Sequence, residues 1–556
     1  MIWFAGGVIS GFLILVYALI VRKEPAEQKD FSPKVYRNLM ILLMLLFGFL
    51  LFFKVTEIPL PYHIDEVSIA YDASAIVKYH CDRFMYRFPV LFKSFGGAGQ
   101  NALYPYLAVI MIRLFGYSIL SVRLPAVLLS LLSALFFSLV IRREYDNKAS
   151  ILSMSFFCIL PFSIMHSRWA LESYLLFPML ILSCCALYHA IHKGNTVYYV
   201  LTGCLLGFTL YSYGVSYMLL PLFLLCILIC LLAIKKITWK NIFAMGIPLF
   251  FLALPLILML AINYGFLDEI QTRFFSIPKV PEFRGGEVGK KFILDNLSFS
   301  RHNIFFSLFC DDGLVYNVIP KFGTMYYPSI PFIIYGFICC IKKSIQDLRT
   351  KQFSFSLMMV VLAVVVYAVS LIVILPNVNR LNPFYIPLIF FLATGFYRII
   401  LNNKTAGAVA ACLYLLCFCF FLYSYFVEFP KELESHQLIT PINDLKKALD
   451  FAESMSNEDE TIYVLDYPYN YIYTILALDI DPYTFNENKV LSYDGYMKAV
   501  GRYRFRKDAI LPECVYIFTK PDVIPDNIDD YGFESEKFGQ ITVYFPPEEN
   551  QRIFEF

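Results

Sequence analysis

The feature that most constrains the fold is a series of apolar runs, each about 12 to 23 residues long, that recurs along most of the chain. An α-helix needs roughly 20 apolar residues to cross the hydrocarbon core of a membrane. Of the 556 residues, 58% are hydrophobic and 16% are charged, and the charged residues avoid these runs. The sequence therefore predicts an α-helical polytopic membrane protein. We expect about 12 spans: Trp3–Val21, Asn38–Phe53, Leu124–Ile141, Ala149–Met165, Ser173–His189, Val197–Ser212, Val215–Ile234, Asn241–Asn263, Ser329–Cys340, Phe353–Ile374, Asn382–Tyr397 and Ala406–Val427.

The distribution of lysine and arginine predicts how the spans are oriented, because basic residues near span ends are retained on the cytoplasmic side. Basic clusters occupy every second connecting segment, at residues 22–37, 142–148, 235–240, 342–351 and 398–404. We expect these segments to be cytoplasmic in a multi-pass protein of the cell membrane. The other connections are then expected to face outward: residues 54–123, 166–172, 264–328, 377–382 and everything after Val427.

Three regions are predicted along the chain. Residues 1–35 form a reverse-anchor span and a cytoplasmic linker, because basic residues follow the first apolar run and none precedes it. Residues 36–427 form the main transmembrane domain, with a first outer loop at 54–123. Residues 428–556 form a small soluble extracytoplasmic domain, which we expect to be α/β. Its signals are the alternating runs "TIYVLDY" and "ITVYFPP" and a helical stretch near Pro441–Ser454.

Charged residues are absent from the interiors of the predicted spans. Ion-coupled transporters usually carry ionisable groups at membrane depth, so this pattern argues against a transporter. The apolar stretch Leu103–Phe115 is interrupted by Arg113, and we expect it to be an interfacial helix of the first outer loop. The net charge of +2 is not gathered into a basic domain, so no nucleic-acid partner is indicated.

An acidic pair follows the second span, in the stretch "YHIDEVSIAYDA" at residues 62–73. The pair is Asp65 and Glu66, and a third acid, Asp72, comes soon after. Asp65 has two interpretations, as the N-cap of a helix or as a functional carboxylate on the outer surface. The apolar positions that follow fit an amphipathic helix lying on the membrane surface: Val67, Ala70, Tyr71 and Ala75.

Further charged candidates lie in the outer turns. Arg168 and Glu172 are four residues apart at the second outer turn, where an ion pair between them or an interaction of Glu172 with the helix dipole is the simpler interpretation. Arg380 precedes the eleventh span, and its simpler interpretation is a side chain that snorkels from a span end. Lys93 lies in the first outer loop.

The order of several stretches resembles the GT-C membrane glycosyltransferases, in the branch of the protein O-mannosyltransferases and the aminoarabinose transferases. These stretches are "HIDEVSIAYDA", "SVRLPAVLLSLLSALFFSLVIRREY" and "MHSRWALESYLLFPMLIL". The chain most resembles bacterial family 39-like members. The resemblance covers roughly residues 38–427, is strongest over 62–180, and implies a GT-C fold with glycosyltransferase activity.

The resemblance also implies roles for individual residues. Asp65 occupies the position of the general base, with Glu66 beside it, and Glu172 occupies the position of a second acid. Some members of the superfamily use a divalent metal, which Asp65 and Glu172 would hold here. The chain departs from the aminoarabinose transferases at Ser68 and Ile69, where those enzymes have a basic residue and a tyrosine, and it lacks their lysine before the interfacial helix.

Sugar transfer from a lipid phosphate needs a carboxylate to accept the acceptor's proton, and cationic groups to stabilise the departing phosphate. We therefore expect an inverting glycosyltransferase that moves a sugar from a polyprenyl-phosphate donor to a protein, lipid or cell-wall glycan at the outer face. The expected substrate contacts are Glu172, Arg168, Arg380, Asp72 and Lys93. Two rivals stay open: a polymerase or ligase of lipid-linked polysaccharide, for which the outer loop 264–328 is long enough, and a transporter of lipid or polysaccharide.

Overall fold

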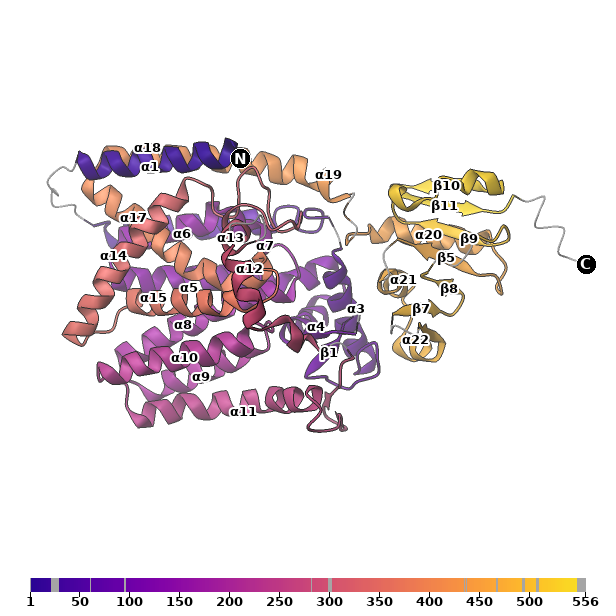
Figure 1. Cartoon of the computed structure of the whole chain (residues 1–556), viewed down its shortest axis with the longest axis horizontal. Coiled ribbons are helices and arrows are strands. Elements are labelled where there is room, and N and C mark those ends of the chain that lie inside the picture. The colour runs from indigo at the N-terminus through magenta and orange to yellow at the C-terminus, as the bar shows by residue number, and fades with distance from the viewer. Residues whose placement is uncertain are drawn as a thin grey trace, which may run out of the picture. The chain divides into compact units, whose positions relative to one another are not determined.

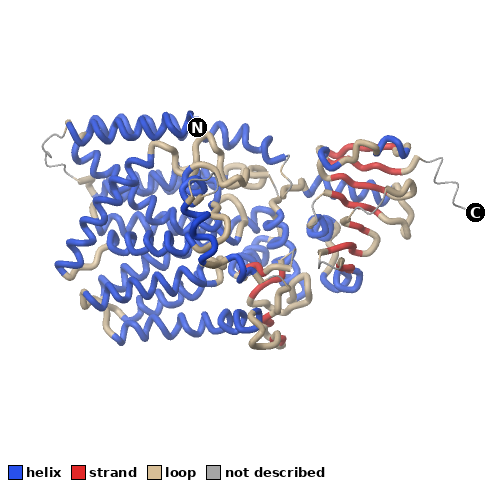
Figure 2. The backbone as a smooth tube through the Cα atoms, viewed as in Figure 1, coloured by secondary structure: helices blue, strands red, loops and turns tan. Residues whose placement is uncertain are grey.

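The structure is a computed structural model of the chain. It describes residues 2–547 except 22–29, 61, 95–96, 282, 299–302, 435, 437, 467–468, 493–495 and 507–509. The chain divides into two compact units. Unit 1 comprises Met1–Val55, Arg123–Leu256 and Gly285–Phe429, and unit 2 comprises Thr56–Val122, Ile257–Arg284 and Pro430–Phe556. Helices dominate the structure, and most strands belong to one sheet near the C-terminus (Figures 1 and 2).

Each apolar run forms a helix, as the sequence predicts. These helices are α1 (Ile2–Ile20), α2 (Pro33–Phe52), α5 (Ile119–Glu144), α6 (Asn147–Ile159), α8 (Leu176–Lys193), α9 (Thr196–Leu210), α10 (Ser216–Ala233), α11 (Trp239–Asn263), α14 (Ser329–Thr350), α15 (Phe355–Leu371), α17 (Tyr385–Asn402) and α18 (Lys404–Tyr423). Shorter helices connect them in unit 1: α7 (Pro161–His166), α12 (Ile293–Leu297), α13 (Ile304–Phe309) and α16 (Val378–Leu381). Another short helix, α19 (Phe429–Glu434), follows α18 and begins the C-terminal part of unit 2.

The number of helices long enough to cross a membrane is smaller than the number of runs. Among the described residues, eight helices are long and apolar enough, or up to nine if α14 and α15, which meet at 116°, count as one span. The predicted span Ala149–Met165 is wrong in its length, because α6 stops at Ile159 and a separate helix starts at Pro161. Proline has no N–H to continue the helix, and Leu160 before it is held in an extended conformation. The chain is nevertheless a multi-pass membrane protein by the length and composition of its helices.

Close backbone contact explains how two of these helices pack. A Cβ atom added to Gly336 on α14 would lie 1.8 Å from the carbonyl oxygen of Phe391 on α17. A Cβ added to Gly395 on α17 would lie 2.1 Å from the carbonyl oxygen of Phe332 on α14. Small residues at facing positions let helix backbones approach closely inside a membrane, where hydrophobicity alone does not drive association.

Unit 2 contains the first loop and the C-terminal segment. The loop forms α3 (Ile64–Tyr79), the strand pair β1 (Leu91–Lys93) and β2 (Gly99–Asn101), and α4 (Leu103–Phe115). The predicted helix at Leu103–Phe115 is confirmed with 13 residues, and its position at the membrane interface stays a prediction. A second strand pair, β3 (Ile270–Gln271) and β4 (Ser276–Ile277), follows α11.

The C-terminal segment is α/β, as the sequence predicts. Its seven-stranded sheet has the order β10-β11-β9-β5-β8-β7-β6, in which β5 runs parallel to both its neighbours and the other pairs are antiparallel. The two alternating runs form β5 and β11, and Tyr463 of β5 packs with Tyr516 and Phe518 of the neighbouring β9 in one core. The elements are α20 (Ile442–Ser454), β5 (Ile462–Leu465), α21 (Asn470–Ala477), α22 (Pro482–Asn488), β6 (Lys489–Leu491), β7 (Met497–Val500), β8 (Tyr503–Arg504), β9 (Val515–Phe518), β10 (Glu534–Phe538) and β11 (Ile541–Phe545).

The C-terminal segment packs directly on α3, with α21 beside it (Figure 1). The backbone N–H of Ile64 donates to the carbonyl of Leu438 at 3.0 Å, and His63 forms an isolated β-bridge with Ile439. The hydroxyl of Tyr71 donates to the carbonyl of Ile480 at 2.6 Å. The helix that carries the acidic pair is therefore held by chain that follows it by about 370 residues or more.

Candidate active site

The first turn of α3 presents the two acids of the pair in different ways. His63 is the N-cap, and its Nδ1 accepts a hydrogen bond from the backbone N–H of Asp65 at 3.2 Å. Glu66 reaches back and accepts from the backbone N–H of His63 at 3.1 Å, which completes a capping box. The interpretation of Asp65 as the N-cap is therefore wrong, because the N-cap hydrogen bond is accepted by the ring nitrogen of His63, two residues earlier. Asp65 is the second residue of the helix.

Exposure separates the two carboxylates further. The side chain of Asp65 is 39% exposed, whereas Glu66 is completely buried. An Oδ atom of Asp65 lies 3.6 Å from Nδ1 of His63, which is itself buried. A helix N-terminus favours negative charge, so Asp65 combines a favourable position for an ionised carboxylate with access for an incoming group. Glu66 instead fixes the helix start from which Asp65 projects.

A buried tyrosine of the C-terminal segment supports this turn. The hydroxyl of Tyr473 is directed at two carbonyl oxygens, those of Tyr62 at 3.0 Å and Leu438 at 2.8 Å. Burial raises the pKa of Tyr473 well above its usual value, and the nearby charges of Glu66 and Asp65 add to the rise. The hydroxyl therefore stays protonated and serves as a donor that ties α21 to the chain entering α3.

The rest of α3 is also buried, which corrects the prediction of an amphipathic helix on the membrane surface. Asp72 is fully buried and accepts from Arg83 through both carboxylate oxygens, at 3.0 Å from Nε and 2.5 Å from Nη2. The same guanidinium donates to the carbonyl of Ser68 at 3.1 Å. These polar groups of α3 find their hydrogen-bond partners inside the unit. A polar residue in this stretch therefore does not indicate a position exposed to solvent. The geometry favours a structural role for Asp72 over the predicted substrate contact.

Arg83 is a residue that sequence reasoning missed. It is completely buried, and the amide of Asn486 on α22 donates to its backbone carbonyl at 2.7 Å. Its neighbour Asp82 is buried as well, and burial, together with the charge of Asp72, raises the pKa of Asp82 to about 8. Arg83 lies beyond the end of α3 at Tyr79, so helical spacing does not place it beside Asp72 and only the fold brings the two together.

Lys93, a predicted phosphate contact, lies among aromatic and acidic side chains on β1. Its Nζ donates to the Tyr86 hydroxyl at 2.7 Å, and that hydroxyl donates to Glu269 at 3.1 Å. Burial lowers the pKa of Lys93. The pKa of Lys489, in the C-terminal segment, is lowered mainly by burial and secondly by the positive charge of Lys93. The two side chains are therefore close to each other. Two cationic side chains from distant parts of the sequence thus share one region of unit 2.

Arg168, in unit 1, is completely buried and binds the end of α2. Its guanidinium donates to the carbonyls of Leu50, Leu51 (3.1 Å) and Phe53 (2.6 Å), and lies 5.1 Å from the ring centre of Phe426. These carbonyls belong to the last turn of a helix, where no intrahelical N–H reaches them. The geometry assigns Arg168 to the capping of α2.

Glu172 is the first residue of a 3₁₀ turn, η1 (Glu172–Leu175), that leads into α8, and it is half-buried. The turn is held from α16 and the residues after it: Ser173 donates to the side chain of Asn379 at 3.2 Å, and the amide of Asn382 donates to the Ser173 carbonyl at 2.5 Å. Glu172 thus lies at the start of the helical segment that leads into α8, where the sequence places it in the first turn of a span, and its role as a second acid stays a prediction.

Arg380 lies on α16 and forms an ion pair with Glu287 at 2.8 Å. The same side chain, 17% exposed, donates to the carbonyls of Ile374 at 2.5 Å and Leu375 at 3.1 Å. Arg380 thus joins the residues that follow α15 to the loop that contains Glu287. A phosphate contact by Arg380 stays a prediction.

Asp65 and Glu172 belong to different units, and their approach in one cavity stays a prediction. Among the described residues, no group of three or more His, Cys, Asp or Glu side chains is spaced to hold a metal ion. A metal held by Asp65 and Glu172 alone would need ligands from substrate or water, since divalent cations of this kind take six or more oxygen ligands.

Comparison with solved structures identifies the fold. The structure of ArnT from Cupriavidus metallidurans in the apo state superposes with a TM-score of 0.53 and 12% sequence identity, over 92% of this chain and 97% of that one. This chain has the GT-C fold. The same protein bound to undecaprenyl phosphate matches with a TM-score of 0.50, again at 12% identity, over 92% of this chain and 98% of that one.

Sequence comparison agrees with the GT-C fold. The family described as dolichyl-phosphate-mannose-protein mannosyltransferase matches residues 101–262, which include α4, α5 and the turn carrying Arg168 and Glu172. No curated protein matches the chain by sequence. The resemblance to the GT-C membrane glycosyltransferases stated from sequence motifs is therefore confirmed at the level of the fold, across nearly the whole chain.

Proposed function

We propose that this chain is an inverting glycosyltransferase that moves a sugar from a polyprenyl-phosphate donor to an acceptor at the outer face of the membrane. The observation that carries the proposal is the first turn of α3, where a partly exposed carboxylate stands on a helix start fixed by buried contacts. Two comparisons support it: the family match, and the GT-C relative that binds undecaprenyl phosphate.

Asp65 acts as the general base in this proposal. It accepts the proton of the acceptor's nucleophilic group as that group attacks the anomeric carbon. The bond from the anomeric carbon to the phosphate oxygen breaks, its electron pair stays on the phosphate, and the configuration at the anomeric carbon inverts. His63 and Glu66 position Asp65 through the capping box rather than by touching substrate.

The cationic side chains stabilise the departing phosphate. We assign this role to Lys93, which has Lys489 near it, and to Arg380, as expected from the sequence. Glu172 positions the acceptor or a divalent metal. Arg168 contributes by fixing the end of α2 through three carbonyls, although the sequence alone placed it among the substrate contacts.

A lipid carrier also solves a supply problem, because nucleotide sugars are made in the cytoplasm and the candidate site is predicted to face outward. No nucleotide-binding motif of the GxGxxG or Walker type follows a strand in this sequence. The proposal covers a hexose or a pentose as the transferred sugar. It covers a protein, a lipid or a cell-wall glycan as the acceptor.

The test is a donor comparison with the purified full-length protein. It would be incubated with labelled polyprenyl-phosphate sugars and, separately, with labelled nucleotide sugars, together with membrane and cell-wall acceptor fractions. We expect label to move to the acceptor only from the polyprenyl-phosphate donors. Transfer from a nucleotide sugar in the complete absence of lipid carrier would overturn the proposal, and so would the absence of transfer from every polyprenyl-phosphate sugar tried.

A further inference from the structure

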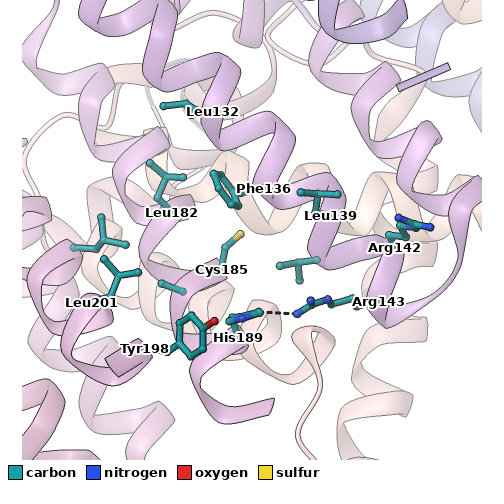
Figure 3. Close-up of a pocket in the computed structure, with 13 residues that line it drawn as sticks. Leu132, Phe136, Leu139, Arg142, Arg143, Leu182, Cys185, His189, Tyr198 and Leu201 are labelled. Carbon is teal, nitrogen blue, oxygen red and sulfur yellow. Dashed lines mark hydrogen bonds between the residues drawn. The ribbon is translucent and has the colours of Figure 1, made fainter. Parts of the chain in front are cut away.

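A groove with an apolar body and a basic end lies between α5, α8 and α9 in unit 1 (Figure 3). Its volume is about 730 Å³, within the range of sites that hold small ligands. The body is lined by apolar side chains from all three helices: Leu132, Phe136 and Leu139 on α5, Leu182, Cys185 and Ala186 on α8, and Leu201 and Leu205 on α9. Such a lining accepts an acyl chain and gives a polar ligand nothing to bind.

The end of the groove has the opposite character. Arg142, Arg143, His189 and Tyr198 line it. The guanidinium of Arg143 lies 2.6 Å from Nδ1 of His189, as the dashed line in Figure 3 shows. Arg142 and Arg143 lie on the last turn of α5, and both are exposed.

A second cavity, of about 530 Å³, adjoins the basic end and shares Leu139 and Arg142 with the groove. It adds two more basic residues from the start of α2, Lys34 and Arg37. Arg142 lies between the cavities, where it donates to Asn147 at 2.6 Å and stacks 4.2 Å over the ring of Tyr36. Stacking and a neutral hydrogen bond orient this guanidinium without neutralising its charge.

The carboxylates nearest in sequence are engaged elsewhere. Glu144, whose side chain is 5% exposed, forms an ion pair with Lys343 at 3.2 Å. Asp146 caps α6 and accepts from the hydroxyl of Tyr397. Of the ion pairs that the described residues form, none joins Arg142 or Arg143 to a carboxylate. The basic end thus offers positive charge to an external anion.

We propose that this groove binds an anionic lipid, with an acyl chain along α5, α8 and α9 and the phosphate of the headgroup on Arg142 and Arg143. Basic residues at span ends attract anionic headgroups. The apolar body of the groove favours a ligand that also carries an acyl chain, because a free anion would leave that body unfilled. Arg142 stands 19 residues along α5 from Arg123, or roughly 28 Å at 1.5 Å per residue. The lipid site uses none of the residues assigned to sugar transfer, so this proposal does not rest on the proposed transfer reaction.

The test is lipid retention by the purified protein, measured by native mass spectrometry during titration with phosphatidylglycerol or with phosphatidylcholine of the same acyl chains. We expect the wild-type protein to prefer phosphatidylglycerol. The double variant Arg142→Gln/Arg143→Gln should lose about 30-fold in affinity for phosphatidylglycerol, at about 1 kcal/mol per basic residue, and should bind phosphatidylcholine as before. The matched control, Arg349→Gln/Lys351→Gln, removes the same charge from exposed positions at the end of α14 and should change neither.

A second variant tests the apolar body. Ala186→Trp fills the groove and should weaken retention of both lipids, with an unchanged elution profile as the check that the protein is folded. Inorganic phosphate alone should not displace phosphatidylglycerol. Equal retention of the two lipids by the wild-type protein would overturn the proposal. Full retention by Ala186→Trp, displacement by phosphate, or equal losses in the arginine and control variants would each overturn it as well.

Discussion

The first turn of α3 and the turn that carries Arg168 are both expected from sequence to face the reaction, yet the structure uses their charged side chains differently. Asp65 is 39% exposed on a helix start whose other contacts are buried. Arg168 is completely buried, and its guanidinium donates hydrogen bonds to the carbonyls at the end of α2. The comparison teaches that a charge near a predicted membrane surface is a functional candidate only if its polar atoms are accessible. A buried charge in the same place is part of the scaffold.

The largest expected effect comes from removing the exposed charge. Asp65→Asn should lower the transfer rate by about 10² to 10⁴, the usual range for loss of a general base. Stability should change little, because the N-cap contacts come from His63 and Glu66. The rate of sugar transfer and the unfolding temperature of the purified variant would be measured together.

Its matched control is Asp479→Asn, which removes a carboxylate that is 82% exposed and paired with Lys78 in the same unit. The control should transfer sugar at the wild-type rate. Near wild-type turnover by Asp65→Asn would return Asp65 to a structural role and remove the contrast between the two turns.

The second effect tests the other side of the comparison. Arg168→Gln should lower the free energy of unfolding by about 3 kcal/mol, because the carbonyls at the end of α2 lose a charged donor. Turnover per folded molecule should stay close to wild type. Denaturant titration and a transfer assay normalised to folded protein would separate the two, with the exposed Arg349→Gln as the control. A large loss of turnover with unchanged stability would show that Arg168 contacts substrate after all.

A smaller effect is expected where the two parts of unit 2 meet. Tyr473→Phe removes one hydroxyl that ties the entry of α3 to the C-terminal segment, so kcat should fall by about fivefold, the equivalent of about 1 kcal/mol. KM should change little, since Tyr473 is buried and acts through the position of Asp65. Tyr503→Phe is the control, because it removes a hydroxyl bonded to Glu453 in the same segment. Equal effects of the two variants on kcat would contradict a positioning role.

The last prediction concerns pH. The pKa of Asp82 is raised to about 8 in the folded protein, above the usual value of about 4 in an unfolded chain. The folded state therefore binds more protons between these values, and stability falls as the pH rises through this window. Asp82→Asn keeps an oxygen acceptor for the N–H groups of Phe84 and Tyr86 but carries no charge.

We therefore expect Asp82→Asn to gain stability over the wild-type protein as the pH rises. The gap between the two unfolding temperatures should widen by about 4 °C from pH 5 to pH 9, because the pKa shift is worth about 4 kcal/mol over this window. A constant gap across this range would mean that Asp82 is not protonated in the folded protein.

Much of the architecture follows from local signals. Each apolar run becomes a helix because length and hydrophobicity act within one segment. The runs "TIYVLDY" and "ITVYFPP" become β5 and β11 for the same reason, since alternation acts within a strand. Pro161 also divides α6 from α7 by local chemistry, and this signal was available in the sequence although the prediction of one span ignored it.

The candidate site follows less closely from the sequence. The N-cap at His63 was hidden because histidine is not among the usual capping residues. The polar positions of α3 indicated a surface helix, but Arg83 and the C-terminal segment bury them. A helix buried by chain that arrives hundreds of residues later has no local signature.

The class of the protein, its helices, its C-terminal sheet and the stretch that carries the acidic pair can all be predicted from the sequence. They can be predicted because each depends on composition and periodicity within one segment. The accessibility of Asp65 and the burial of Glu66, Asp72 and Arg168 emerge only when the chain is folded. Accessibility depends on which distant segments cover a side chain, and burial is what turns a charge from a reactive group into a structural one.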